Sequence, residues 1–126
     1  MKVWHLRNDI YHITTLLILE KNKDVAREYL RKKFSLNKKD AEDLIDGDGC
    51  CSWILHVETE KRVYVIWIPS FHGYIGDICL LGHEVIHLVN NHFHDSGVEP
   101  GTNCESFCYY FDYILKQCLE KLTGGK

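Results

Sequence analysis

The sequence predicts an α+β domain in which a small antiparallel sheet of about three strands packs on helices. β-Branched and aromatic residues fill 11–19, and they recur in 52–58 and 62–68, two runs separated by a short polar segment that is typical of a hairpin. Apolar residues at helical spacing fill 75–94 and 103–121. Strands in one part of the chain and long helices in another are typical of the α+β class.

The first part of the chain contributes strands and two helices. The N-terminal residues form a short strand or an ordered arm, and the apolar run that follows reads as a largely buried strand. Asn22 can cap a helix over about 23–34, with basic residues on its outer face. Asn37 offers a second cap for a short helix through Leu44.

The second part is predicted to hold two long helices. A turn at 95–101 follows the helix over 75–94 and folds the last helix, 103–121, back antiparallel to it. Four residues of the first helix are expected to form its core side: Cys79, Ile86, Val89 and Phe93.

Composition limits the functions that the chain can have. Its 126 residues, 45% hydrophobic and 26% charged, suit one compact domain with a core, so residues 1–126 are predicted to be a single domain. The net charge of -3 argues against a nucleic-acid partner, and the basic stretch 21–39 reads as a solvated helix face. No bilayer-spanning run or signal peptide is evident, so we expect a cytoplasmic protein whose six cysteines are reduced.

The stretch that carries chemistry is an H-E-x-x-H sequence inside the helix over 75–94. His83 and His87 are four residues apart, so on a helix both imidazoles lie on one face and can reach one ion. Zinc favours imidazole nitrogens, and Glu84 can receive a proton from a water on the metal. Imidazole and carboxylate also suit other divalent metals, and the motif can arise by coincidence in a metal-free fold.

A catalytic zinc needs a third protein ligand, for which Glu105 is the best candidate. It lies eighteen residues after His87, near the start of the last helix, which an antiparallel turn can bring beside the motif. The competing interpretation is a capping box, because Thr102 and Glu105 have the spacing of a helix cap.

Other candidate groups lie around these residues. Tyr109, one turn after Glu105, can hydrogen-bond an oxyanion on a polarised carbonyl, although packing explains it as well. Cys104 and Cys108 have i, i+4 spacing and can bind zinc as thiolates or serve as small packing residues. His72, in the loop before the motif helix, is a further possible contact for a substrate.

The residues from about 50 to 120 resemble a minimal gluzincin-like zinc metallopeptidase, of the small standalone kind found in bacteriophages. The resemblance rests on the strand pair ending in Val65-Ile66-Trp67-Ile68-Pro69, on Gly82-His83-Glu84-Val85-Ile86-His87, and on Asn103-Cys104-Glu105-Ser106-Phe107-Cys108-Tyr109-Tyr110. It implies zinc ligands at His83, His87 and Glu105, with Glu84 as general base. It also implies that the outer strand, here 62–68, holds an extended peptide by added-strand pairing.

The leading hypothesis is therefore a zinc-dependent peptidase-like hydrolase that attacks a peptide or amide carbonyl. The alternative is a non-catalytic zinc-binding domain that binds a protein, for instance in the interplay of a phage with its bacterial host. A peptide or protein is the expected substrate or partner in either case, and the cytoplasm of an infected bacterium is the expected location.

Overall fold

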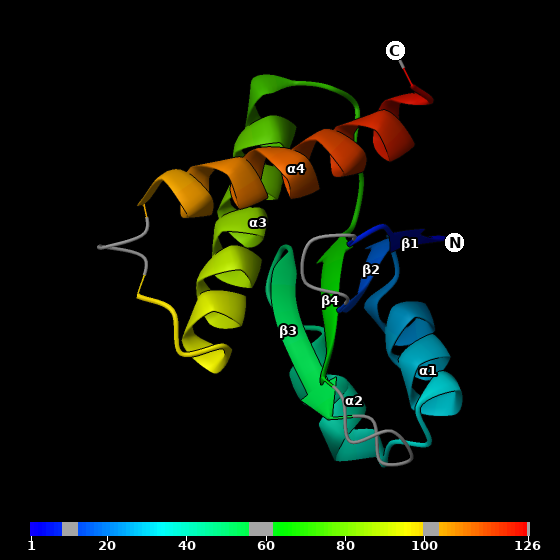
Figure 1. The fold of residues 1–126 in the computed structure, drawn as a ribbon. Coiled ribbons are helices and arrows are strands. Elements are labelled where there is room, and N and C mark those ends of the chain that lie inside the picture. The colour runs from blue at the N-terminus through cyan, green and yellow to red at the C-terminus, as the bar shows by residue number, and fades with distance from the viewer. Residues whose placement is uncertain (9–12, 56–61, 100–103, 126) are drawn as a thin grey trace.

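The computed structural model describes residues 1–8, 13–55, 62–99 and 104–125 and contains four strands and four helices there (Figure 1). The strands are β1 (Lys2–Leu6), β2 (Thr14–Leu19), β3 (Cys50–Leu55) and β4 (Arg62–Ile68). The helices are α1 (Lys23–Lys33), α2 (Lys38–Leu44), α3 (Ile75–Asp95) and α4 (Cys104–Thr123). The α+β class is confirmed, and the described residues contain the expected elements; residues 11–12, 56–58 and 103 of those elements lie outside the described residues.

The sheet is mixed and has four strands, in the order β1-β2-β4-β3, so the expectation of an antiparallel sheet of about three strands is wrong. β1 pairs antiparallel with β2, and β3 pairs antiparallel with β4, which confirms the hairpin. β2 and β4 run parallel. The chain reaches this arrangement because α1 and α2 carry it from β2 to the far edge, where β3 begins, and β4 then returns between β3 and β2.

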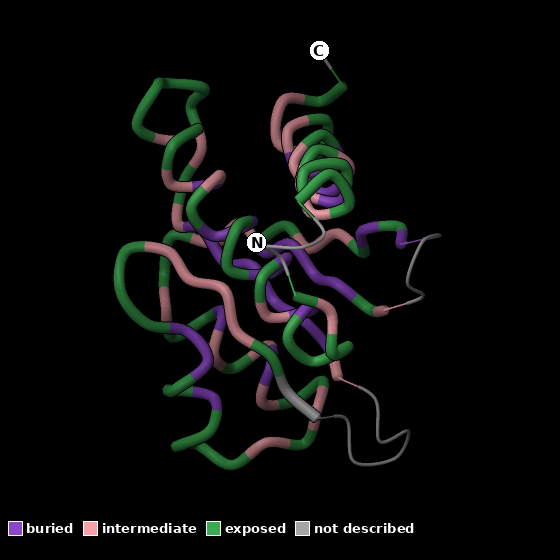
Figure 2. Tube along the Cα trace, turned by 60° about the vertical axis from the view of Figure 1, so that its left-hand side comes forward, coloured by how far each residue is buried: buried purple, intermediate pink, exposed green. Residues whose placement is uncertain are grey.

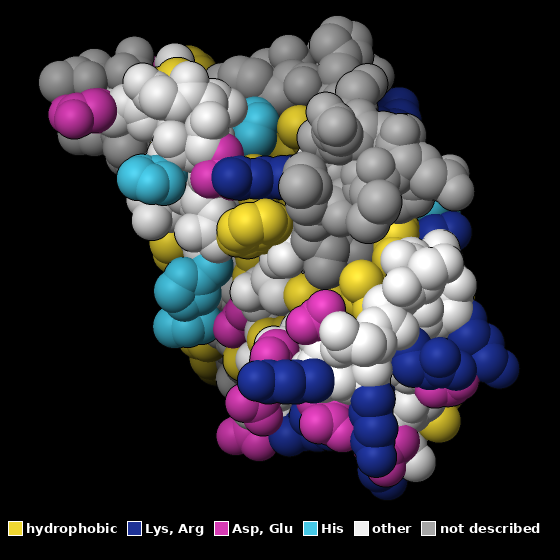
Figure 3. Space-filling model, turned by 90° about the horizontal axis from the view of Figure 1, so that it is seen from below, with side chains coloured by type: hydrophobic (Ala, Val, Ile, Leu, Met, Phe, Trp, Pro, Cys, Tyr) yellow, Lys and Arg dark blue, Asp and Glu magenta, His cyan; other side chains and the backbone are white. Residues whose placement is uncertain are grey.

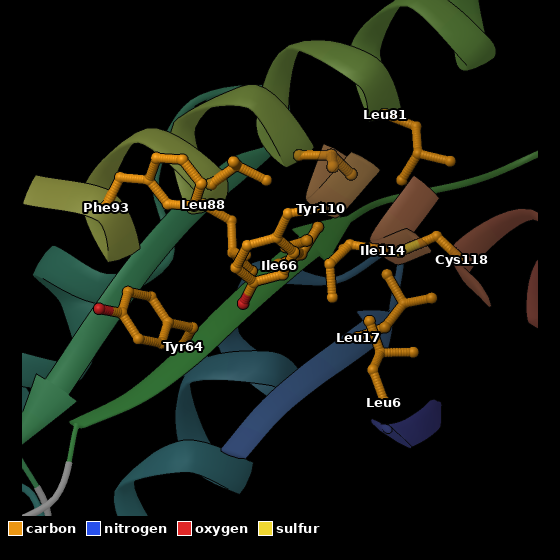
Figure 4. Packing of buried hydrophobic residues seen from close by; sticks show 12 residues of the cluster. Leu6, Leu17, Tyr64, Ile66, Leu81, Leu88, Phe93, Tyr110, Ile114 and Cys118 are labelled. Atoms are coloured by element: carbon orange, nitrogen blue, oxygen red, sulfur yellow. The ribbon is translucent and has the colours of Figure 1, made fainter. Parts of the chain in front are cut away.

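Both faces of the central strands are buried, which explains why β2 and β4 are apolar at successive positions rather than alternately. Leu16 and Ile18 face the side covered by α1 and α2, while Leu17 between them faces α3 and α4. On β4, Tyr64 and Ile66 face α3 and α4 (Figure 4). The molecule therefore has three layers, with the predicted motif helix in one outer layer.

Local signals set the ends of the helices. Side chains cap α1 and α2, since Asn22 accepts a hydrogen bond from the N–H of Asp24 and Asn37 from that of Asp40. α3 ends where Gly97 takes a positive φ of 72°, a conformation that favours glycine. Among the described residues, no helix is long and apolar enough to cross a membrane.

α4 crosses over α3 instead of running back alongside it, as Figures 1 and 2 show from two directions. Near its start Phe107 packs edge-on against Phe93 of α3, and further along Gln117 exchanges two hydrogen bonds of 2.7 Å with the backbone of Arg7 after β1. α4 is directed toward β1 because its apolar residues cover the β1–β2 half of the sheet, while α3 covers β4 and β3.

This crossing decides which part of α3 is covered. Val89 and Phe93 are buried, as expected for the core side of the helix. Cys79 and Ile86 are exposed, so their assignment to the core is wrong. All four share one side of α3, but only its C-terminal residues are buried, where Phe93 contacts Phe107 of α4.

Candidate metal centre

The two motif histidines lie together on the exposed side of α3. Their Nε2 atoms are 3.1 Å apart and the rings meet edge to face. The side chain of His83 is 65% exposed, so solutes can reach the pair from solvent. The pair points away from the core, since the sheet-facing residues of α3 occupy the opposite side.

The separation of the two nitrogens suits a shared divalent ion. With zinc–nitrogen distances of 2.0–2.1 Å and tetrahedral angles, two imidazole ligands have their nitrogens about 3.3 Å apart. The observed 3.1 Å is close to this value. The same distance also fits a hydrogen bond between two neutral imidazoles, one donating and one accepting.

Glu84 is buried although it directly follows an exposed histidine. It is 5% exposed, and its Oε1 lies 3.8 Å from Nε2 of His83. Burial raises the pKa of this carboxyl, while the charges of His83 and His87 act in the opposite direction. Glu84 therefore binds a proton more readily than an ordinary, solvated glutamate.

The environment of Glu84 includes a neighbour that sequence reasoning missed. Cys51 of β3 is partly buried beneath α3, where burial first and the charge of Glu84 second raise the pKa of its thiol. The thiol of Cys51 is therefore less acidic than an ordinary cysteine thiol. The hairpin pattern predicted β3, but nothing in the spacing indicated which of its residues faces the motif helix.

The predicted third ligand, Glu105, lies on a different helix from the pair. Glu105 is exposed in the first turn of α4, and Tyr109, one turn later, is 70% exposed. In the described part of the chain, no group of three or more His, Cys, Asp or Glu side chains is placed to hold a metal ion. Residues 100–103, which precede α4 and include half of the proposed capping box, lie outside the described residues. The role of Glu105 thus stays a prediction.

The expected peptide-holding strand is not at the edge of the sheet. β4 is paired on both sides, with β2 and with β3, so it has no free edge for an added strand. β3 forms the edge of the sheet on the side nearest the motif helix, against which it packs. Any strand addition beside the histidine pair would therefore use β3.

A second polar cluster, also missed from the sequence, lies where α3 ends. Asp95 accepts a 2.6 Å hydrogen bond from the hydroxyl of Tyr64 and forms an ion pair with Arg62, so the C-terminus of α3 is tied to β4. His92 lies edge-on to Tyr64 and contacts Ser96 through Nε2 at 3.3 Å. Because these groups bond to one another, we interpret the cluster as a structural contact that holds the end of α3 against β4. The tertiary packing of α3 on the sheet brings these side chains together, so the sequence alone did not indicate the cluster.

Charge is distributed unevenly around these sites. No Lys or Arg occurs from residue 63 to residue 115, a span that holds six acidic residues and five of the eight histidines. In Figure 3 histidines line one edge of the face that is shown, and most of the Lys and Arg side chains lie away from them. A cation that approaches the histidine pair thus meets no fixed positive charge on α3.

Comparison of the chain with protein-family models, with curated proteins and with solved structures found no match. The gluzincin-like interpretation therefore stays a prediction from the sequence.

Proposed function

We propose that this chain is a zinc-dependent, peptidase-like hydrolase whose metal is held by His83 and His87, with Glu105 as third ligand. The 3.1 Å separation of the two Nε2 atoms on an accessible helix face carries the proposal, since two imidazoles so arranged are ready to share one divalent ion. Bound there, zinc supplies a Lewis acid that lowers the pKa of a water and polarises a carbonyl.

Glu84 is the proposed general base. Its raised pKa makes it a better proton acceptor near neutral pH than an ordinary glutamate, and its Oε1 lies beside the pair at 3.8 Å from His83. It takes a proton from the attacking water and then passes it to the leaving amine. Tyr109, exposed one turn after Glu105, can donate its hydroxyl to the oxyanion.

The edge strand β3 is the proposed holder of the substrate. It pairs with β4 on one side and packs against α3, so an extended peptide that adds to its outer edge passes next to the helix that carries the histidines. A peptide or an unfolded segment of a protein is therefore the substrate class that suits the site.

The first test is the metal content of the purified protein after zinc is supplied. We expect about one zinc per chain in the wild type, with affinity lowered more than about 100-fold in His83→Ala and in His87→Ala. His94→Ala is the matched control, because His94 is an exposed histidine on the same helix outside the pair, and it should keep its zinc. A wild type without zinc, or zinc retained by both variants of the pair, would refute the proposal.

Glu105→Ala and Glu84→Gln separate the roles of the two glutamates. Loss of zinc in Glu105→Ala would support the role of Glu105 as a ligand. Retention of zinc would instead support the interpretation of Glu105 as a helix-capping residue. Glu84→Gln should keep zinc but lower hydrolysis of a peptide substrate by about 10²–10⁴-fold, the usual contribution of a general base.

A second candidate function is a non-catalytic zinc domain that binds a protein. The observation that favours it is the set of large apolar side chains exposed on and before the N-terminal half of α3, among them Tyr74 and Ile75. In that case Glu84→Gln would leave function unchanged, which distinguishes it from the hydrolase.

A further inference from the structure

One side of α3 carries a seam with the spacing of a coiled coil. The residues on it are separated alternately by four and three positions, as at the a and d positions of a heptad. They are Ile75, Cys79, Gly82, Ile86, Val89 and Phe93. The last two are buried, Phe93 against Phe107 of α4, while Ile75, Cys79 and Ile86 are exposed and Gly82 is half-buried; we call these first four the open seam.

The open seam exposes more apolar surface than a surface helix requires. Ile75 is 82% exposed and Ile86 is 48% exposed, and Ile78, at the margin of the seam, is 43% exposed. In an amphipathic helix of a monomer, large aliphatic residues at these spacings normally face the core. Contiguous exposed apolar surface of this kind marks a contact with another molecule.

Gly82, in the middle of the open seam, gives independent support. Glycine inside a helix is less stable than alanine, yet no other described part of the chain lies within 4 Å of where its side chain would be. Nothing in the described part of the monomer thus requires the absence of a side chain. Close approach of another helix backbone is the feature that a small residue at this point permits.

The charges on the helix indicate what covers the seam. Between Ile75 and His87 the exposed side chains of α3 include no acidic residue and no Lys or Arg. A foreign partner is commonly selected and oriented by complementary charges, which this face lacks. Two identical copies of an uncharged apolar seam, in contrast, are complementary to each other and meet no like-charge repulsion.

We propose that the open seam pairs with the open seam of a second copy of this chain, with the two α3 helices antiparallel. Ile75 of each copy then lies opposite Ile86 of the other, and Cys79 lies opposite Gly82, so a medium side chain faces the smallest one. A parallel pair is disfavoured, because α4 packs on the continuation of the seam at Phe93 and the two α4 helices would meet there.

The proposed dimer is independent of the proposed hydrolase. His83 and His87 lie on the exposed side of α3 next to the seam rather than in it, so they stay accessible when the seams pair. The contact is a single helix pair and is smaller than a standard interface, so we expect weak association with a Kd on the order of 10 µM.

Sedimentation equilibrium of the full chain, at concentrations from about 1 µM to 0.5 mM with EDTA present, tests the proposal. We expect a reversible monomer–dimer equilibrium that is not weakened by 1 M NaCl, since the contact is apolar. Ile75→Lys should raise the Kd at least about 100-fold, because the change places a charge in the interface twice. Val25→Lys on α1 is the matched control, an exposed aliphatic residue on another element, and should not change the Kd.

Gly82→Ala provides a variant whose folding is not at risk. It should raise the midpoint of thermal unfolding, because alanine favours helix and finds open space, yet raise the Kd by about tenfold or more, because the helices can no longer approach. A monomer at 0.5 mM would overturn the proposal. So would a dimer that EDTA or His83→Ala abolishes, which is the outcome expected if a metal ion joined the histidine pairs of two copies.

Discussion

Removal of the hydroxyl of Tyr64 tests the tie between α3 and the sheet. Tyr64 is 1% exposed, and its hydroxyl donates to Asp95 at 2.6 Å. Phenylalanine fills the same space, so Tyr64→Phe opens no cavity, and Asp95 keeps Arg62 as its partner. The change therefore removes one hydrogen bond to a charged acceptor, worth about 1.5–3 kcal/mol. Because the side chain of Asp95 is partly solvated, we expect the lower end, about 1.5 kcal/mol.

Urea unfolding at pH 7, followed by tryptophan fluorescence, measures this loss. For a chain of this size it corresponds to a fall in Tm of about 5 °C. Tyr109→Phe is the matched control, because Tyr109 is largely exposed, and it should change the free energy of unfolding by less than about 0.5 kcal/mol. A double-mutant cycle with Asp95→Ala should give a coupling energy of about 1 kcal/mol between the two side chains.

The pH dependence of that coupling follows from the pKa of Asp95. The hydrogen bond from Arg62 is the main cause that lowers this pKa, so the stabilisation is present above the unfolded value near 3.8 and is lost as the pH falls through the lower folded value. The coupling should therefore be equal at pH 7 and pH 5. A coupling near zero at pH 7, or a loss in Tyr64→Phe no larger than in the control, would refute the proposed tie.

Three further predictions concern the stability of the fold. Burial lowers the pKa of His92, so the stabilisation by its neutral form is present above the unfolded pKa near 6.5 and is lost as the pH falls below that value. The urea midpoints at pH 7.5 and pH 5.5 should therefore differ less in His92→Gln than in the wild type. An equal difference in the two proteins would contradict this prediction. Asn37→Ala removes the cap of α2 and should cost about 1 kcal/mol in urea unfolding, whereas Asn90→Ala, on an exposed helix position, should cost almost nothing. Trp67→Ala should lower the free energy of unfolding by about 3–5 kcal/mol, because it leaves a cavity in the core and removes the indole N–H that donates to the carbonyl of Glu20. A loss below about 2 kcal/mol would show instead that the core relaxes to fill the cavity.

The elements of this fold could be predicted from the sequence because their signals are local. Asn22 and Asn37 cap helices that begin at the next residue, and the strands around the hairpin carry β-branched and aromatic residues at successive positions. The order of the strands in the sheet does not follow from local sequence signals. Whether β2 pairs with β3 or with β4 depends on the path of the chain through α1 and α2, and the apolar pattern of β2 fits either partner.

The same distinction applies to the candidate site. The proximity of His83 and His87 follows from their separation by one helical turn, and their Nε2 atoms are indeed 3.1 Å apart in the structure. The position of Glu105 depends on the direction of α4, which is set by contacts far along the helix. Gln117 bonds to the backbone of Arg7, and that contact directs α4 toward β1. No spacing between the motif and Glu105 contains that information.

α3 shows how one helix can serve separate purposes on separate faces. Its buried face carries Glu84 toward β3, its exposed face carries the histidine pair, and its seam is buried only at the C-terminal end. Periodicity identifies which residues share a face, but only tertiary packing decides that Val89 is buried and Ile86 is exposed. Since metal binding and self-association are assigned to different faces, they can be lost independently. Ile75→Lys should keep zinc and lose the dimer, and His87→Ala should keep the dimer and lose zinc. Any variant that loses both would indicate that the two faces act as a single site.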